Sequence, residues 1–335
     1  MESLLVGGLA RGHRADWSLL IGATVIMMIA TGSGCGSVPA RFMGKAIERM
    51  GDPILPAQHH VSDLLLPHTG LSVLWAGHAT VLIQIRDKVF LTDPLFTNTA
   101  GMFSRRYIEP GFDPAALSHV DYTLVSHLHF DHFSYGSLDM LPTDGVLLLP
   151  FGALAYTPDF GFREIREMQP WESLEEEGLT ITAVPVQHFS GRYGVDIPWM
   201  RDRGYTGYVI EYGGITVFIG GDTGYHPELF KEIGRRFTID LAILPIAPVE
   251  PRDFMRFGHV DPAEALEIFS DLKARYMMPM HHRTLLQGFD PTDTFPVEQL
   301  QRIAEHREIR ERIFVLEIGE RREILAARAA SPDGR

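Results

Sequence analysis

The chain of 335 residues is 45% hydrophobic and carries a formal net charge of −13. This length can bury the core of one large α/β domain. The negative charge argues against a nucleic-acid-binding protein, because a polyanion would be repelled. Cys35 is the single cysteine, which excludes an internal disulfide and a thiolate zinc cluster, so any metal ion must be held by imidazole and carboxylate groups.

The N-terminus resembles an export signal. Residues 17–34, WSLLIGATVIMMIATGSG, contain no charged residue and follow Arg11 and Arg14, as an apolar region follows a basic one in a secretory signal. Cys35 comes next, at a position similar to a bacterial lipoprotein cleavage site, where the cysteine is lipidated. An uncleaved membrane anchor with a free thiol is the alternative. We therefore predict a signal or lipid-anchor region over 1–35, membrane association through the N-terminus, and a periplasmic lipoprotein.

Three further regions are predicted from the change in pattern along the chain. Residues 36–70 lack clear periodicity and contain several prolines, which indicates a tether. Residues 71–322 are predicted to form one α/β domain, and 323–335 a C-terminal tail. Helices are expected at 263–274, 296–309, 227–236 and near 136–141. Strands are expected at 71–77, 80–85, 88–93, 121–126, 178–186, 207–222 (a hairpin), 241–246, 276–280 and 312–318.

The stretch TLVSHLHFDHF, 123–133, concentrates metal-binding side chains directly after an apolar strand. In an extended chain, residues two apart point the same way, so His127 and His129 can share one metal ion. Asp131 and His132 follow and can point at a second ion. Imidazole and carboxylate groups suit Zn²⁺, Fe²⁺ or Mn²⁺. This spacing is a strong signal for a metal site.

Four residues cannot complete two metal sites, so further ligands must come from elsewhere in the chain. His188, Asp222 and His281 each follow a strand-like apolar run. All three are therefore expected at strand ends, where open α/β folds place their functional residues.

The order of these residues resembles the metallo-β-lactamase superfamily. That resemblance implies an α/β fold, a four-layer αββα sandwich of two mixed sheets with outer helices. It also implies a dinuclear site in which His127, His129 and His188 hold one metal ion. The second ion would be held by Asp131, His132 and His281, with Asp222 bridging both.

Five shorter motifs are similar to the branch of N-acylphosphatidylethanolamine-hydrolysing phospholipase D. They are WAGHAT (75–80), LTDPLF (91–96), GDTGY (221–225), FGHVDPAEA (257–265) and MHHRT (280–284). Two places depart from that branch: His282 and Arg283 stand where it typically carries tryptophan and glycine, and the segment 189–206 differs throughout. The sugar-phosphate lactonase branch shares much of the metal pattern.

The resemblance also implies roles around the metal ions. Asp93 and His78 would support the ligands, with turn residues as the alternative for each. His259 matches an active-site histidine that is not a ligand, with a role in helix entry as the alternative. Arg283 is predicted to contact the substrate.

We expect a hydrolase that uses two divalent transition-metal ions, Zn²⁺ in the first place and Fe or Mn as alternatives. A hydroxide bridging the ions would attack a phosphodiester, with Asp131 orienting it and His259 donating a hydrogen bond. A phospholipid is the expected substrate, and no nucleic-acid partner is expected. A lactonase or carboxylic ester hydrolase remains an alternative, and a non-catalytic metal-binding surface protein is a remote one.

Overall fold

The computed structural model describes residues 37–102 and 104–327, and the chain divides into two compact units, 1–44 and 45–335. In the first unit the described residues, 37–44, contain the start of helix α2 (Val38–Arg49). The predicted signal segment and Cys35 lie outside the described residues. Within 37–102 and 104–327, no helix is long and apolar enough to cross a membrane.

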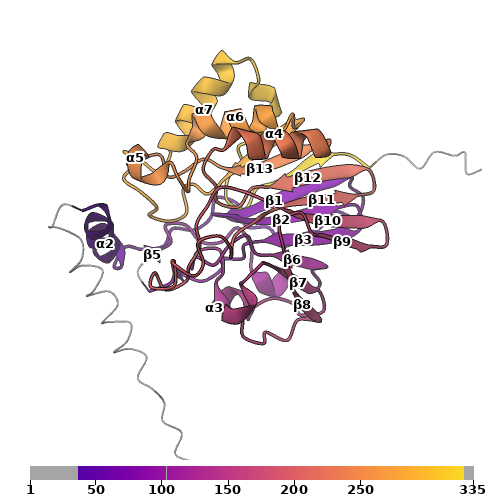
Figure 1. Cartoon of the computed structure of the whole chain (residues 1–335), viewed down its shortest axis with the longest axis horizontal. Coiled ribbons are helices and arrows are strands. Elements are labelled where there is room, and N and C mark those ends of the chain that lie inside the picture. The colour runs from indigo at the N-terminus through magenta and orange to yellow at the C-terminus, as the bar shows by residue number, and fades with distance from the viewer. Residues whose placement is uncertain (1–36, 103, 328–335) are drawn as a thin grey trace, which may run out of the picture. The chain divides into compact units, whose positions relative to one another are not determined.

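Two large mixed sheets form the centre of the second unit (Figure 1). The seven-stranded sheet has the order β15-β1-β2-β3-β6-β7-β8, and the six-stranded sheet has the order β14-β13-β12-β11-β10-β9. The first sheet consists of β1 (Leu71–Gly77), β2 (Thr80–Ile85), β3 (Lys88–Thr92), β6 (Tyr122–Leu124), β7 (Val146–Pro150), β8 (Glu164–Met168) and β15 (Arg321–Leu325). The second consists of β9 (Ser173–Glu176), β10 (Leu179–Val184), β11 (Gly207–Tyr212), β12 (Ile215–Ile219), β13 (Leu241–Pro245) and β14 (Tyr276–Met280).

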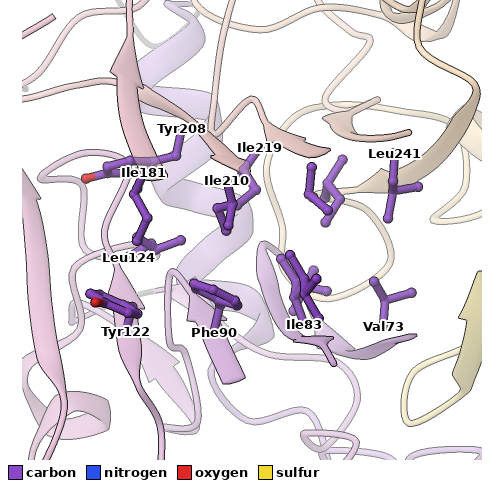
Figure 2. Close-up of a cluster of buried hydrophobic side chains, with 14 of the residues drawn as sticks. Val73, Ile83, Phe90, Tyr122, Leu124, Ile181, Tyr208, Ile210, Ile219 and Leu241 are labelled. Carbon is purple, nitrogen blue, oxygen red and sulfur yellow. The ribbon is translucent and has the colours of Figure 1, made fainter. Parts of the chain in front are cut away.

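The main core lies between the two sheets (Figure 2). Strands β1, β2, β10 and β12 read as near-continuous apolar runs and are almost wholly buried. This is the pattern of strands that are covered on both faces. The facing side chains include Val73, Ile83, Phe90, Tyr122 and Leu124 from one sheet and Ile181, Tyr208, Ile210, Ile219 and Leu241 from the other.

Helices and short turns cover the outer face of each sheet. Helices α4 (Pro227–Arg236), α6 (Pro262–Asp271) and α7 (Phe295–His306) pack on the six-stranded sheet through a second apolar cluster. A third cluster covers the seven-stranded sheet and includes Leu138 of α3 (Tyr135–Leu138). The remaining elements are α5 (Arg252–Met255), the 3-10 turns Pro114–Ala116, Leu154–Tyr156 and Arg310–Arg312, and the hairpin of β4 (Thr99–Ala100) and β5 (Ser104–Arg105). The predicted four-layer αββα sandwich is confirmed.

Most predicted elements are present within a few residues of their expected bounds. Helix α6 begins at Pro262, where Asp261 accepts a hydrogen bond from the backbone of Glu264 at 2.9 Å and caps the helix. The hairpin of β11 and β12 turns at Gly213 and Gly214, both with positive φ, as the sequence predicts.

The prediction of a strand at 312–318 was wrong. Ile313, Leu316 and Ile318 are buried as its apolar pattern suggests, but only Ile313 pairs, through an isolated bridge to Met277. The last strand is instead β15, RREIL, which the sequence analysis missed because edge strands are often charged. Helix α2 and strands β7, β8 and β9 were also missed.

Strand direction places the ends of several strands at one edge of each sheet. Strands β1, β3 and β6 run the same way, because β1 and β3 both pair antiparallel with β2 and β3 pairs parallel with β6. By the same reasoning β10, β12, β13 and β14 run together in the other sheet. The segments that follow these strands carry the predicted site residues.

Candidate metal centre

Each sheet contributes donor side chains from loops that follow its strands. In the seven-stranded sheet, His78 follows β1, Asp93 follows β3, and the segment 127–132 follows β6. In the six-stranded sheet, His188 follows β10, Asp222 follows β12 and His281 follows β14. The structure brings all seven predicted ligands together between the sheet edges, in four overlapping groups of donors that could hold a metal ion.

The first donor group consists of His127, His129 and His188. The Nε2 atom of His127 lies 2.9 Å from Nδ1 of His129, which lies 3.4 Å from Nε2 of His188. The three imidazole nitrogens lie within 4.8 Å of one another, which is close enough for them to share one ion. The arrangement fits a divalent cation, which imidazole nitrogens bind readily.

The second donor group consists of His78, Asp131, His132 and His281. The Nε2 atoms of His132 and His281 are 3.2 Å apart. Asp131 Oδ2 lies 3.0 Å from His78 Nε2 and 3.8 Å from His132 Nε2. Mixed imidazole and carboxylate donors again suit a divalent transition metal.

Asp222 lies between the two groups. Its carboxylate is 3.9 Å from His127 Nε2, 3.3 Å from His132 Nε2 and 3.0 Å from His281 Nε2. Its side chain is buried. A buried carboxylate that faces imidazoles of both groups could contact an ion held by either group, and its bridging role stays a prediction.

The outer nitrogen of several imidazoles is bonded to the surrounding protein. His188 Nδ1 donates to the Gly258 carbonyl, and His281 Nδ1 donates to the Ala247 carbonyl, each at 2.9 Å. His132 Nδ1 donates to Asp93 Oδ2 at 2.8 Å. A proton on the outer nitrogen leaves the inner nitrogen with its lone pair toward the centre, which is the tautomer that a metal ligand needs.

The electrostatics of the centre follow from burial and from the close packing of these groups. Burial, with help from neighbouring imidazoles, holds the pKa of His127 and of His188 well below 6.5. Burial would also lower the pKa of His132, but the carboxylates of Asp222, Asp93 and Asp131 outweigh it and raise that pKa well above 6.5. Burial would raise the pKa of Asp222, yet the histidines around it, His281 first, hold it well below its usual range.

Asp93 and His78 both contact predicted ligands. Asp93 Oδ1 accepts from the backbone of Ser126 at 2.6 Å, and its Oδ2 accepts from Ser126 Oγ at 2.7 Å. Together with the bond from His132, these contacts fix the start of the ligand segment. His78 contacts Asp131 directly, and one of its ring nitrogens lies close enough to the second donor group to bind the same ion.

His259 and Arg283 occupy different surroundings. His259 Nδ1 lies 3.5 Å from Asp222 Oδ2, so this predicted active-site residue is at the centre. The Arg283 guanidinium is paired with a carboxylate: its Nη1 donates to Glu317 at 2.5 Å, and the residue lines a cavity of about 660 Å³ with Tyr107 and Asp290. The predicted contact between Arg283 and a substrate stays a prediction.

Three residues that hold the centre were missed in the sequence. Ser126 lies 3.0 Å from His127 Nδ1, Thr284 Oγ1 accepts from the His78 backbone at 2.6 Å, and Gln287 Nε2 donates to His78 Nδ1 at 3.2 Å. Ser126 directly precedes the histidine motif, which was a usable signal. Thr284 and Gln287 depend on how the segment after β14 folds back.

The backbone at the centre is strained at specific positions. His78, Asp93 and His281 have positive φ values of 55°, 35° and 64°, which are uncommon for residues other than glycine. Gly221, before Asp222, has φ +57°, and a Cβ atom there would lie 2.5 Å from Ser126 Cβ. Only glycine allows the loop after β12 to approach the loop after β6 so closely.

Comparisons with known proteins agree with this geometry. The family model described as "Beta-lactamase superfamily domain" matches residues 88–282. The chain is 30% identical over 274 residues to N-acyl-phosphatidylethanolamine-hydrolyzing phospholipase D 1 of Caenorhabditis elegans, covering 77% of this chain and 76% of that protein. It is also 30% identical over 259 residues to the mitochondrial N-acyl-phosphatidylethanolamine-hydrolyzing phospholipase D of Saccharomyces cerevisiae, but spans only 54% of that protein.

Among solved structures, an isothiocyanate hydrolase from Delia radicum gut bacteria is similar, with a TM-score of 0.61 and 18% identity. The match covers 75% of this chain and 98% of that one, and it supports the fold. The family model spans more than half of the chain, and its match agrees with the donor groups at the strand ends. The chain therefore belongs to the metallo-β-lactamase superfamily and is a metal-dependent hydrolase.

Proposed function

We propose that the protein is a phosphodiesterase that hydrolyses a phospholipid, as an N-acylphosphatidylethanolamine phospholipase D does. The observation that carries this proposal is the pair of adjoining donor groups with Asp222 between them. Such a site fits two divalent ions, which suits phosphoryl transfer because two cations can neutralise charge on the phosphoryl oxygens. The similarity to the Caenorhabditis elegans protein supports the lipid substrate.

We assign the ions as Zn²⁺, and Fe or Mn would fit the same nitrogen and carboxylate donors. His127, His129 and His188 would hold one ion, and Asp131, His132 and His281 the other, with Asp222 contacting both. When bound, the ions would lower the pKa of a coordinated water and polarise the phosphodiester.

Asp131 and His259 have the positions of groups that handle the substrate. Asp131 has a side chain that is 27% exposed, more than Asp222, so it can reach an incoming nucleophile or substrate. Burial lowers the pKa of His259 to about 4, which leaves the imidazole neutral at neutral pH. A neutral imidazole can donate one hydrogen bond to a phosphoryl oxygen or to the leaving group.

Exposed aromatic side chains beside the centre support a lipid substrate. Phe130, between His129 and Asp131, is 38% exposed, and its ring lies 6.2 Å from that of Tyr193. Phe257, which precedes the glycine that accepts from His188, is also exposed. Apolar groups at these positions would suit acyl chains better than a sugar phosphate.

The proposal is tested by supplying the purified, metal-loaded protein with three substrate classes. We expect hydrolysis of bis(p-nitrophenyl) phosphate and of N-acylphosphatidylethanolamine, and much slower hydrolysis of phosphomonoesters. If lactones or carboxylic esters turn over while no phosphodiester does, the lactonase alternative replaces this proposal. If metal binds and no class is hydrolysed, a non-catalytic metal-binding role replaces it.

We also propose that the protein is exported and anchored to a membrane through Cys35, as a periplasmic lipoprotein. The support is the uncharged segment 17–34 before the single cysteine. More than one acyl chain would anchor the protein stably, since each buried CH₂ contributes about 0.8 kcal/mol. We expect Cys35→Ala to abolish fatty-acid labelling in the native host and to leave the precursor unprocessed. Unchanged labelling would contradict the lipoprotein, and a mature protein that begins at Met1 would indicate an uncleaved anchor.

A further inference from the structure

The four-residue turn from His129 to His132 carries three of the predicted ligands, and an arginine closes it from outside. Arg192 Nη1 lies 2.7 Å from the Phe133 carbonyl and 3.3 Å from the Leu128 carbonyl. These two carbonyls are those of the residues directly before and after the turn. We propose that Arg192 is a positioning residue that holds this turn in its metal-binding conformation and so sets the affinity for the metal.

The guanidinium is enclosed as well as hydrogen-bonded. Arg192 is 6% exposed, and its guanidinium carbon lies 3.8 Å from the ring centroid of Tyr135, 4.6 Å from that of Phe130 and 5.1 Å from that of Phe133. A planar guanidinium can donate to two carbonyls and contact ring faces at the same time. An ammonium group can match the charge but not this geometry.

The backbone of Arg192 is itself held in place. Asp196 accepts from the backbone N–H groups of Arg192 and Tyr193 at 2.8 and 2.9 Å. Ser190 Oγ donates to the Gly204 carbonyl at 2.8 Å, which closes the base of the segment 189–204. These hydrogen bonds fix the backbone from which the guanidinium extends toward the turn.

The contact between Arg192 and the turn joins two loops that carry predicted ligands and that follow strands of different sheets. The segment 189–204 begins directly after His188, in the loop that follows β10, whereas His127 and His129 follow β6. Arg192 thus couples the position of His188 to that of His129, and both belong to the first donor group. Groups that orient metal ligands from outside typically change metal affinity by about 10–100-fold when removed.

The test compares Arg192→Met and Arg192→Lys with Arg203→Met. Arg203 lies on the same segment but is exposed, with its guanidinium carbon 5.9 Å from the Phe151 ring centroid. Zn²⁺ dissociation constants are measured by chelator competition, and the melting temperature of the metal-free protein is measured alongside. We expect about 10–100-fold weaker binding for Arg192→Met, a smaller loss for Arg192→Lys, and no change for Arg203→Met.

A role limited to general stability predicts a different result. It would lower the melting temperature of the metal-free protein and leave the dissociation constants within twofold of the native protein, which would overturn the proposal. If Arg192→Met does not fold, Arg192→Lys decides alone: a dissociation constant within twofold of the native value would overturn the proposal. Because no substrate is used, these outcomes are independent of whether the protein is a phosphodiesterase.

Discussion

Asp93 and His132 form a buried pair in which the carboxylate Oδ2 lies 2.8 Å from the imidazole Nδ1. The other oxygen of Asp93 accepts from the Ser126 backbone, so both oxygens act only as acceptors. Asp93→Asn would present an amide N–H₂ to one of these donors whichever way the amide turns. We expect about 10–100-fold weaker metal binding, measured by chelator competition. Asp139→Asn, at an exposed position, is the control, and equal affinity in both variants would contradict this role.

Asp222→Ala should reduce the number of metal ions that the two donor groups bind. This change removes the carboxylate that faces His127, His132 and His281, without adding bulk. Elemental analysis of protein purified without chelator should approach two transition-metal ions per chain for the native protein and fall toward one for the variant. Hydrolysis should be nearly lost. Asp222→Asn, which keeps one oxygen donor, should retain more metal, and a fully active Asp222→Ala would rule out the two-ion centre.

Tyr208 should contribute to stability through one buried hydrogen bond. Its hydroxyl group donates to the Val125 carbonyl at 2.8 Å and links β11 to the segment before the histidine motif. Tyr208→Phe should leave that carbonyl unsatisfied and lower the free energy of unfolding by about 1–3 kcal/mol. Urea denaturation of the metal-free protein measures this change. Tyr212→Phe removes an exposed bond to Asp87, so its cost should be below about 0.5 kcal/mol, and equal costs would refute the assignment.

His119 should give a small pH-dependent contribution to stability. Hydrogen bonds to Asp144 and Asp121 raise the pKa of His119 above 6.5, so the folded protein holds this proton more tightly than the unfolded chain does. The contribution is fully present below pH 6.5 and is lost as the pH rises through the folded-state pKa. Because the imidazole is exposed, solvent screening keeps such a contribution within about 0.2–1 kcal/mol.

The melting temperature of His119→Gln should therefore fall below that of the native protein at pH 6 and approach it at alkaline pH. His60→Gln, which replaces an exposed histidine, is the matched control. A deficit in His119→Gln that grows with pH would reverse the predicted sign.

The metal centre was largely predictable because its signals are local. Four donors lie within 127–132, and His188, Asp222 and His281 each follow an apolar run that forms a strand. The matching ends of same-direction strands then bring them together. Gly221 belongs to the motif GDTGY, but the close approach of its backbone to Ser126 depends on how both loops fold.

Other features depend on packing that no short pattern encodes. Arg192 reaches carbonyls about sixty positions away in the chain, and Arg283 turns toward Glu317 because the segment after β14 folds in that direction. The missed strand β15 is half exposed and charged, so hydrophobic periodicity could not indicate it. Conversely, the apolar pattern of 312–318 resembles that of a strand, although only Ile313 forms a β-bridge, to Met277.

The donor groups draw on loops from both sheets, and this has a consequence for folding. An ion held by His127 and His188 together would link the two halves of the sandwich, and its removal would break that link. The unfolded chain cannot preform such a site, so binding energy becomes folding energy. Free metal at 100 times its dissociation constant would add about 2.7 kcal/mol to stability. Metal supply in the surrounding compartment would thus govern how much folded protein persists, as well as how fast it turns over substrate.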